Sequence, residues 1–350
     1  MMTKISHNTM KDTINDLKLF SQTNYCKKFL RINYDNIDDK SLEVHAEISS
    51  ACFRQAFEYY NTAINSPITT SPLLYSYCLN NMAKGMTYLL TTDEKILNGF
   101  RNHGFTVNSS KIKSDLLSTP ITINATGATQ SLLALTNSSI IKNVDITFDE
   151  LIKRVPSLRD IYEKSTDSKS YVLRKDEDYE YSMNGEIDEN DKIQKIFEKL
   201  NITYGYQEWK NETKLWIPIS GQKIIEENEK NYIYLDTFVL PFEIDNEIAV
   251  INQIFVTYLI IMGYGMLVRY NAHKWEKFID SKSSDENVLI STSISSCVES
   301  FLNIIHYLLF NYNYIEEKYT DNKVKDLLQE KETIDIIEEK LVERLKEGLR

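Results

Sequence analysis

The fold is decided by the stretch Ile248-Ala-Val-Ile-Asn-Gln-Ile-Phe-Val-Thr-Tyr-Leu-Ile-Ile-Met-Gly-Tyr-Gly-Met-Leu-Val268, which contains no charged residue. As a helix, rising about 1.5 Å per residue, it is long enough to cross a bilayer. However, polar Asn252 and Thr257 interrupt it, and the next apolar segment carries Glu299 and His306. These polar residues favour a buried core helix of a soluble protein over a membrane span.

Further helices are expected on both sides of this stretch. The sequence predicts helices over residues 11–32, 41–65, 72–91, 93–103, 246–270 and 284–310. Ser41 and Ser71 are the expected N-caps of two of them, and Gly104 is a typical C-terminal stop. One face of the helix from Pro72 is expected in the core, with Leu74, Cys78, Met82, Met86 and Leu89 aligned on it.

The middle of the chain is mixed. Strands are predicted over residues 105–107, 121–124, 170–174, 214–219 and 232–239, and the acidic residues 175–191 read as a solvated loop or hairpin. The fold class is therefore mainly α with a smaller β-containing middle region (α+β) and long helices at both ends. We expect four segments: helical 1–104, mixed 105–244, helical 245–318 packing on the first, and a charged amphipathic helix over 319–350.

Composition limits the compartment and the partners. The net charge of −11 argues against broad capture of nucleic acid, which normally needs a basic patch. Cys26, Cys52, Cys78 and Cys297 are widely separated, form no CxxC pair and read as buried thiols. Because residues 1–10 also lack the apolar region of a signal peptide, we expect a cytoplasmic protein without a membrane anchor.

The usual catalytic signatures are missing from the sequence. It contains no GxxxxGK[ST], GxGxxG, HExxH or GxSxG, so we expect no cofactor and no metal. The pairs Arg101 with His103 and Arg269 with His273 do not reproduce the spacing of helical HEPN-type ribonucleases. Glu208-Trp209-Lys210 is a weaker metal-nuclease signal, with a surface loop as the alternative. Zinc held by the cysteines is a further alternative, although close ligand pairs are absent.

Two segments resemble a known family. Ser71-Pro-Leu-Leu-Tyr-Ser-Tyr-Cys-Leu-Asn-Asn-Met-Ala-Lys84, followed by His103-Gly104, is similar to the SPLLxYY…NLxKA…HG signature of the YaaC-like family of bacterial proteins. Gly265-Met-Leu-Val-Arg-Tyr-Asn-Ala-His-Lys-Trp275 resembles the RY…W element of that family. The resemblance covers residues 15–310 and implies a bacterial cytoplasmic setting. It implies no reaction or substrate.

The motif side chains have physical interpretations of their own. Leu73, Tyr77, Asn80 and Lys84 share a helix face, which places an ammonium and an amide at a cleft or at a solvated helix edge. His103 fits a last-turn residue near helix carbonyls. Arg269 with Tyr270 suits either an anion site or a buried pair with an acidic residue.

Two functions follow as hypotheses. The first is a bacterial interaction or regulatory protein, a component of a stress or antiphage defence system, with a protein partner or self-association through residues 321–350. The alternative is a nuclease or other phosphate-handling enzyme, in which Lys84, Arg101, His103, Arg269 and His273 converge on one pocket.

Overall fold

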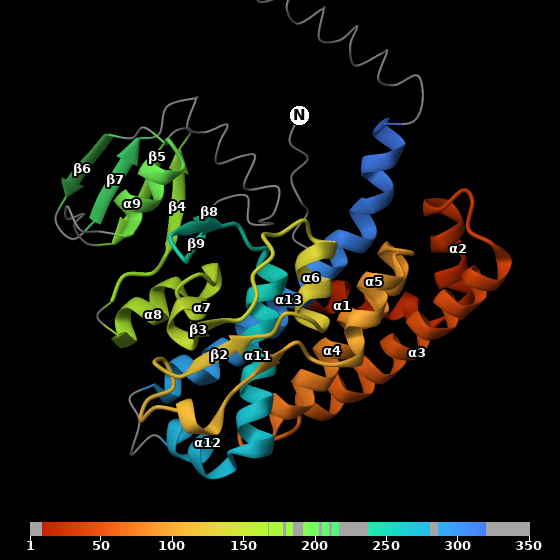
Figure 1. Cartoon of the computed structure of the whole chain (residues 1–350), viewed down its shortest axis with the longest axis horizontal. Coiled ribbons are helices and arrows are strands. Elements are labelled where there is room, and N and C mark those ends of the chain that lie inside the picture. Colours follow the sequence, from red (N-terminus) through yellow and green to blue (C-terminus); the bar gives the residue numbers. More distant parts are fainter. Residues whose placement is uncertain are drawn as a thin grey trace, which may run out of the picture. The chain divides into compact units, whose positions relative to one another are not determined.

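The computed structural model describes residues 9–166, 168–177, 180–184, 192–202, 205–209, 212–216, 237–280 and 286–319 (Figure 1). By its internal contacts the chain divides into two compact units, Met1–His306 and Tyr307–Arg350. Helices dominate, and small antiparallel sheets lie in the middle of the sequence, so the predicted fold class is confirmed. The four segment boundaries given above stay a prediction.

The first third of the chain forms α1 Met10–Lys18, α2 Thr23–Asn33, α3 Asp39–Ala63, α4 Ser71–Leu90 and the short α5 Glu94–Asn98. The single helix predicted over residues 11–32 is wrong, because the 3-10 turn Leu19–Ser21 separates α1 from α2. Phe20 in this turn is fully buried, with its ring 5.4 Å from that of Phe29 and 5.5 Å from that of Phe53. Burial of this ring between α2 and α3 offsets the broken helical hydrogen bonds.

Two predicted helix caps are also wrong. Asp38 caps α3 by accepting a hydrogen bond from the backbone N–H of Ser41 at 2.9 Å, and a carboxylate is favoured at this position by the helix dipole. Ser71 is the first helical residue of α4, because its own N–H donates to the Pro67 carbonyl and continues a preceding turn. Gly104 has a φ of 78°, the left-handed conformation typical of a stop, and follows the 3-10 turn Gly99–Arg101.

The uncharged stretch forms α11, Gln253–Tyr270, which begins later than predicted. Residues 242–249 instead form a hairpin of β9 Phe242–Ile244 and β10 Glu247–Ala249, turned by Asp245 and Asn246 at positive φ. The prediction of helix over 246–252 is therefore wrong. Asn252 ends the extended segment and caps α11, its side chain accepting from the Ile254 N–H at 2.9 Å.

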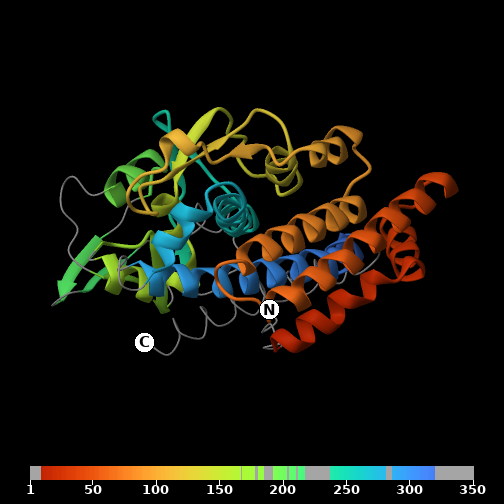
Figure 2. The ribbon, with the colours of Figure 1, turned by 90° about the horizontal axis from the view of Figure 1, so that it is seen from below.

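Helix α11 lies at the centre of the first unit, seen nearly end-on in Figure 2 between α4 and the strands. Its two glycines permit close approach from opposite faces, since residues two apart point about 200° apart on a helix. A Cβ on Gly263 would lie 2.7 Å from Phe148, and one on Gly265 would lie 2.5 Å from Oγ of Ser76 on α4. Because these two positions have no side chain, α11 packs closely against α4 on one face and against α7 (Phe148–Ile152) on the other.

The C-terminal helices complete this core. They are α12 Ala272–Ile279 and α13 Asn287–Tyr319. The ring of Tyr258 on α11 stacks 6.2 Å from Phe301 on α13, and that of Tyr264 lies 5.3 Å from Trp275 on α12. Tyr264 also shares a 2.9 Å hydrogen bond with Ser293. Aromatic side chains of α11 therefore pack against both α12 and α13.

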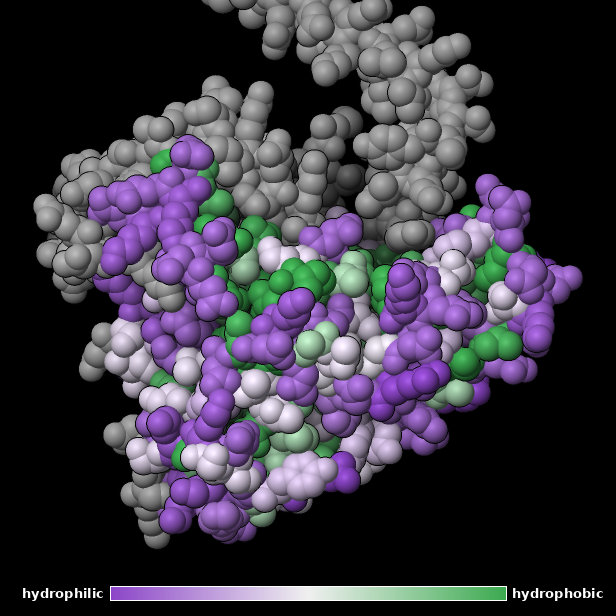
Figure 3. Space-filling model, viewed as in Figure 1, coloured by the Kyte–Doolittle hydropathy of each residue, from purple (hydrophilic) through white to green (hydrophobic). Residues whose placement is uncertain are grey.

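Two of the described helices are long and apolar enough to cross a membrane by length and composition. They are α11 and residues 287–310 of α13, whose apolar windows are 78% and 61% buried in the protein. Such burial is also usual for the core helices of soluble proteins. On the described part of the face in Figure 3, hydrophilic residues separate several apolar groups, and no continuous apolar band is visible there.

The strands form three antiparallel sheets. The first has the order β1-β2-β3, with β1 Phe105–Thr106, β2 Pro120–Ile123 and β3 Val144–Thr147, and the second is the β9-β10 hairpin. The third has the order β6-β7-β5-β4-β8, with β4 Val172–Glu177, β5 Glu180–Asn184, β6 Gly205–Trp209, β7 Glu212–Trp216 and β8 Thr237–Val239. The acidic residues 175–191, predicted as a loop or hairpin, thus begin in the β4-β5 hairpin. Of the strand predicted over 232–239, residues 232–236 lie outside the described residues.

The third sheet has its own small core. Helix α9, Lys192–Lys199, buries Ile196 and Phe197 against Leu173, Leu215 and Phe238 of the strands, and Tyr181, Ile202 and Leu240 complete this cluster. The helices α6 Ala128–Leu135 and α8 Arg159–Thr166 and the 3-10 turn Pro156–Leu158 lie before this sheet in sequence. None of these short helices is predicted from the sequence.

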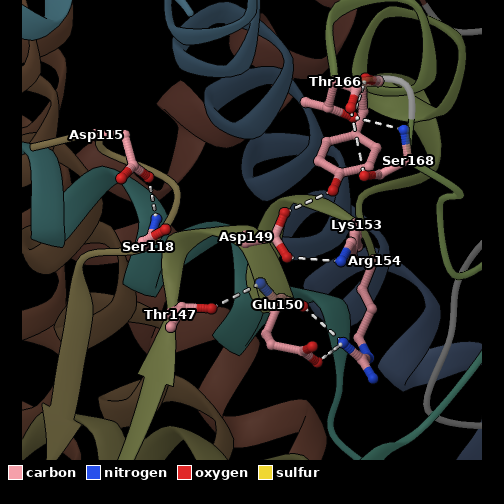
Figure 4. Close-up of polar contacts among 10 residues, drawn as sticks. Asp115, Ser118, Thr147, Asp149, Glu150, Lys153, Arg154, Thr166 and Ser168 are labelled. Carbon is pink, nitrogen blue, oxygen red and sulfur yellow. Dashed lines mark hydrogen bonds and ion pairs between the residues drawn. The ribbon is translucent and has the colours of Figure 1, made fainter. Parts of the chain in front are cut away.

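A buried arginine ties the end of β8 to α7. Arg154 is fully buried and donates to the carbonyls of Leu240, Pro241 and Glu150, as well as to the carboxylate of Glu150 at 2.8 Å. Figure 4 shows Arg154 reaching Glu150, while Asp149 binds Lys153 in the same turn. The guanidinium therefore supplies the donors that this irregular stretch of backbone lacks.

Candidate functional site

Tyr77, one of the sequence-predicted residues of α4, lies at the antiparallel contact of this helix with α3. The ring of Tyr77 is 5.2 Å from that of Tyr59, and two turns later a Cβ on Gly85 would lie 3.2 Å from Cys52. Tyr59 comes seven residues after Cys52, whereas Tyr77 comes eight residues before Gly85, so the two helices run in opposite directions with nearly equal spacing. Lys84, seven residues after Tyr77, falls on the same margin of α4 and is half-buried as Tyr77 is.

One end of this margin brings three sequence-predicted residues together. Nη1 of Arg269, at the end of α11, lies 3.4 Å from the hydroxyl of Tyr77. Burial lowers the pKa of His103, and the positive charge of Arg269 lowers it further. His103 is therefore held near Arg269 in its neutral form at pH 7.

At the other end of this margin, the charges of Lys84 and Arg101 act on Cys52 and Tyr88. Burial raises the pKa of the Cys52 thiol, and the positive charge of Lys84 opposes this rise. Burial likewise raises the pKa of Tyr88, one turn beyond Lys84, and the charge of Arg101 opposes that rise. The charge of Lys84 thus acts on Cys52, and the charge of Arg101 acts on Tyr88. We call the whole margin the basic-aromatic edge; it consists of Tyr59, Tyr77, Lys84, Tyr88, Arg101, His103 and Arg269.

Other predicted residues do not join this edge by any contact among the described residues. His273 is exposed on α12, two residues before the buried Trp275 and hence on nearly the opposite face of that helix. Trp275 is buried and donates to the Ile68 carbonyl at 3.1 Å. Asn80 accepts from the hydroxyl of Tyr258 on α11 at 2.9 Å, so its amide is used inside the helix contact.

The predicted alternative of a buried acidic partner for Arg269 is wrong. The Arg269 side chain is exposed and lies 5.0 Å from the Tyr270 ring. Within the described ranges no carboxylate lies within 4 Å of Lys84, Arg101 or Arg269, whereas Lys27, for example, pairs with Glu43 at 2.6 Å. The three cations of the edge keep their charge available to a ligand.

The four cysteines are buried, free thiols on separate helices. Burial raises the pKa of Cys26 to about 11, and it raises the pKa values of Cys78 and Cys297 as well. Thiols held protonated in this way are poor nucleophiles. Among the described residues no three His, Cys, Asp or Glu side chains form a group able to hold a metal ion, so the zinc alternative has no site there.

The nuclease tripeptide falls partly outside the described residues. Glu208 and Trp209 end β6, and Lys210 is not among the residues described. The sequence also missed part of the edge. Tyr59 and Tyr88 carry no motif signal of their own, and only the antiparallel pairing of α3 with α4 shows that they lie beside the motif residues.

Comparisons with known proteins give one informative result. No curated protein and no solved structure matches the chain significantly. The model of a family described as YaaC-like Protein matches residues 18–309, which include every residue of the basic-aromatic edge. The resemblance inferred from the two motif segments is thereby confirmed, and this chain belongs to the YaaC-like family.

Proposed function

We propose that this chain is a regulatory protein that senses a nucleotide at the basic-aromatic edge. The observation that carries the proposal is the set of cations, Lys84, Arg101 and Arg269, without carboxylate partners in the described part of the chain. Charge-assisted hydrogen bonds from such groups to phosphate oxygens are strong. The edge supplies these donors beside tyrosine rings.

The tyrosines favour a nucleotide over a bare phosphate. Tyr59 and Tyr77 are half-buried with ring centroids 5.2 Å apart, and Arg269 reaches the hydroxyl of Tyr77. Aromatic side chains beside cations are the usual platform for a nucleobase, which stacks on the ring while the cations bind phosphate. Along α4, Tyr77 and Lys84 are about 10 Å apart, from the rise per residue, a spacing that suits a base at one and a phosphate at the other.

The charge of the whole chain limits the size of the ligand. At a net charge of −11 the protein repels long polyanions, and long nucleic acids bind chiefly through many phosphate contacts. A single nucleotide makes few such contacts and depends less on the overall field. We therefore expect a mononucleotide to bind better per phosphate than RNA or DNA.

Calorimetric titration of the full chain with ATP, AMP and inorganic phosphate tests the proposal. We expect ATP to bind, and Lys84→Met or Arg269→Met to weaken it about tenfold or more, since a hydrogen bond to a charged group contributes about 1.5–3 kcal/mol. Lys40→Met is the matched control, because Lys40 is an exposed cation at the start of α3 and is not one of the residues of the edge. Equal ATP affinities for the Lys40, Lys84 and Arg269 variants would refute the assignment.

One observation favours the second candidate, a phosphate-handling enzyme. A histidine that is neutral at pH 7 is competent as a general base, and His103 has its pKa lowered beside Arg269. The same titrated samples distinguish the two functions by chromatography. Intact ATP and intact RNA after incubation support regulation, whereas turnover lost in His103→Gln and retained in Lys40→Met supports the enzyme.

We further propose that the protein works in the bacterial cytoplasm without a membrane anchor. Its four described thiols are unpaired, which suits a reducing compartment. A protein partner or self-association through residues 321–350, and a place in stress or antiphage defence, are parts of the same proposal.

A further inference from the structure

A small pocket lies between the start of α8 and the edge of the third sheet. Its volume is about 250 Å³. The lining comes from the turn before α8, from α8 itself and from β4 and β8, and includes Ser157, Arg159, Asp160, Arg174 and Thr237. The pocket shares no residue with the basic-aromatic edge.

Arg159 is the unusual member of this lining. Its side chain is buried, with 8% of the residue exposed, and neither Nε nor Nη1 has a hydrogen-bond acceptor in the described part of the chain. Buried guanidinium N–H groups without acceptors cost free energy, because they lose their hydration without replacement. Arg154, which is buried to a similar degree, donates to the carbonyls of Leu240 and Pro241 and to Glu150. The protein thus satisfies one buried arginine and leaves two nitrogens of the other, which lines the pocket, without acceptors among the described residues.

The sheet side of the pocket adds a second cation and a hydroxyl. Arg174 on β4 and Thr237 on β8 are direct partners across the antiparallel pair, so their side chains lie on the same face. Oγ1 of Thr237 is buried and, among the described residues, also lacks a partner. Asp160 is the one carboxylate named in the lining, against two guanidinium groups. The pocket therefore combines a net positive charge with unused donors.

We propose that this pocket binds a phosphate group, with Arg159 and Arg174 holding its oxygens and Thr237 donating its hydroxyl. Arginine presents paired N–H donors in the geometry that matches phosphate. The volume is below the usual range of about 300–1,000 Å³ for drug-sized ligands. The pocket therefore fits a phosphate group rather than a whole nucleotide. The phosphate comes either from inorganic phosphate or from a small phosphomonoester.

Thermal unfolding and calorimetry of the full chain with two probes test this site. Inorganic phosphate and glycerol phosphate are added separately, with sodium chloride at equal ionic strength as the reference. We expect one or both probes to raise the unfolding temperature, and Arg174→Met to weaken binding at least about tenfold. Binding of inorganic phosphate identifies the free ion as sufficient, and binding of glycerol phosphate alone identifies a phosphomonoester.

Two further variants make the result specific. Arg159→Met removes an unpartnered buried charge, so we expect it to fold at least as stably as the wild type without phosphate and to lose the phosphate-dependent rise. Lys164→Met removes an exposed charge from the same helix and is expected to respond as the wild type does. The proposal fails if neither probe acts beyond the salt reference, or if Lys164→Met and Arg174→Met lose binding equally.

Discussion

Arg154 is an example of how much one side chain contributes when the backbone around it has no regular partners. Its guanidinium lies 4.0 Å from the Phe242 ring centroid and 4.6 Å from that of Tyr171, and its N–H groups reach the carbonyls of Leu240 and Pro241. These carbonyls belong to the segment that leaves β8. Without the arginine they would be buried without a donor, because no strand among the described residues pairs with them.

Replacing Arg154 by methionine is therefore expected to lower the free energy of unfolding by about 3 kcal/mol or more, as is usual when one partner of a buried charged network is removed. Urea denaturation followed by circular dichroism measures the change. Lys27→Met, which breaks the more exposed pair with Glu43, is the control and is expected to cost at most about 1 kcal/mol. Similar losses for the two variants would show that Arg154 contributes no more than a surface ion pair.

The same residues show how far sequence reasoning reaches at this scale. Lys84 and Arg269 are predictable because they lie in motif segments on the long helices α4 and α11. His103 belongs to a motif segment too, but it follows the 3-10 turn Gly99–Arg101, so its predicted place in the last turn of a helix is wrong. Arg154, Arg159 and Arg174 carry no such signal, since Arg154 lies in the turn after α7, and Arg159 and Arg174 are the single arginines of the short elements α8 and β4. Their roles depend on backbone carbonyls and strand register, which become known only when the chain is folded.

At the scale of elements, α11 depends on having no side chain at two positions. Glycine inside a helix costs about 1 kcal/mol relative to alanine, and the helix retains it at both Gly263 and Gly265. At Gly265 a Cβ would lie 2.5 Å from Oγ and 2.6 Å from Cβ of the buried Ser76. The close contact of α11 with α4 explains the glycine.

Gly265→Ala is consequently expected to destabilise the protein by about 1–2 kcal/mol, because overpacking of a core contact costs more than the gain in helix propensity. Differential scanning calorimetry measures the effect. Ser295→Ala, at an exposed position of α13, is expected to change stability by no more than about 0.5 kcal/mol. The double variant Gly265→Ala with Ser76→Gly should recover part of the loss. A stabilised Gly265→Ala protein would contradict the packing argument.

Element prediction succeeds here where a helix is long and fails where a short tertiary contact overrides the pattern. The helices over 41–65 and 72–91 are confirmed as α3 and α4, since their apolar spacing persists over many turns. The break at Phe20 and the β9-β10 hairpin before α11 were not predictable, because a buried ring and two positive-φ residues decide them. The short helices α6 to α9 were also not predictable, because tertiary contacts rather than a long apolar pattern decide them.

At the scale of the whole molecule, the family match and the first compact unit end almost together. The match ends at residue 309 and the unit at His306, so residues 321–350 lie beyond both. In sequence this segment repeats Leu327, Ile334 and Leu341 at seven-residue steps among charged residues. Such a pattern predicts an amphipathic helix whose apolar stripe needs a partner.

A chain that ends at Thr320 is accordingly expected to unfold at the same temperature as the full chain but to lose self-association, because the apolar stripe is removed while the core is kept. Light scattering after size exclusion measures the mass of each, against 40.8 kDa for one full chain. The variant Leu327→Glu with Ile334→Glu places two charges on the stripe and should also dissociate. Lys325→Glu changes the net charge by the same amount on the opposite face of the predicted helix, so it should assemble normally. If the truncated chain and the stripe variant keep the mass of the full chain and the same co-purifying partner, residues 321–350 are not the interface.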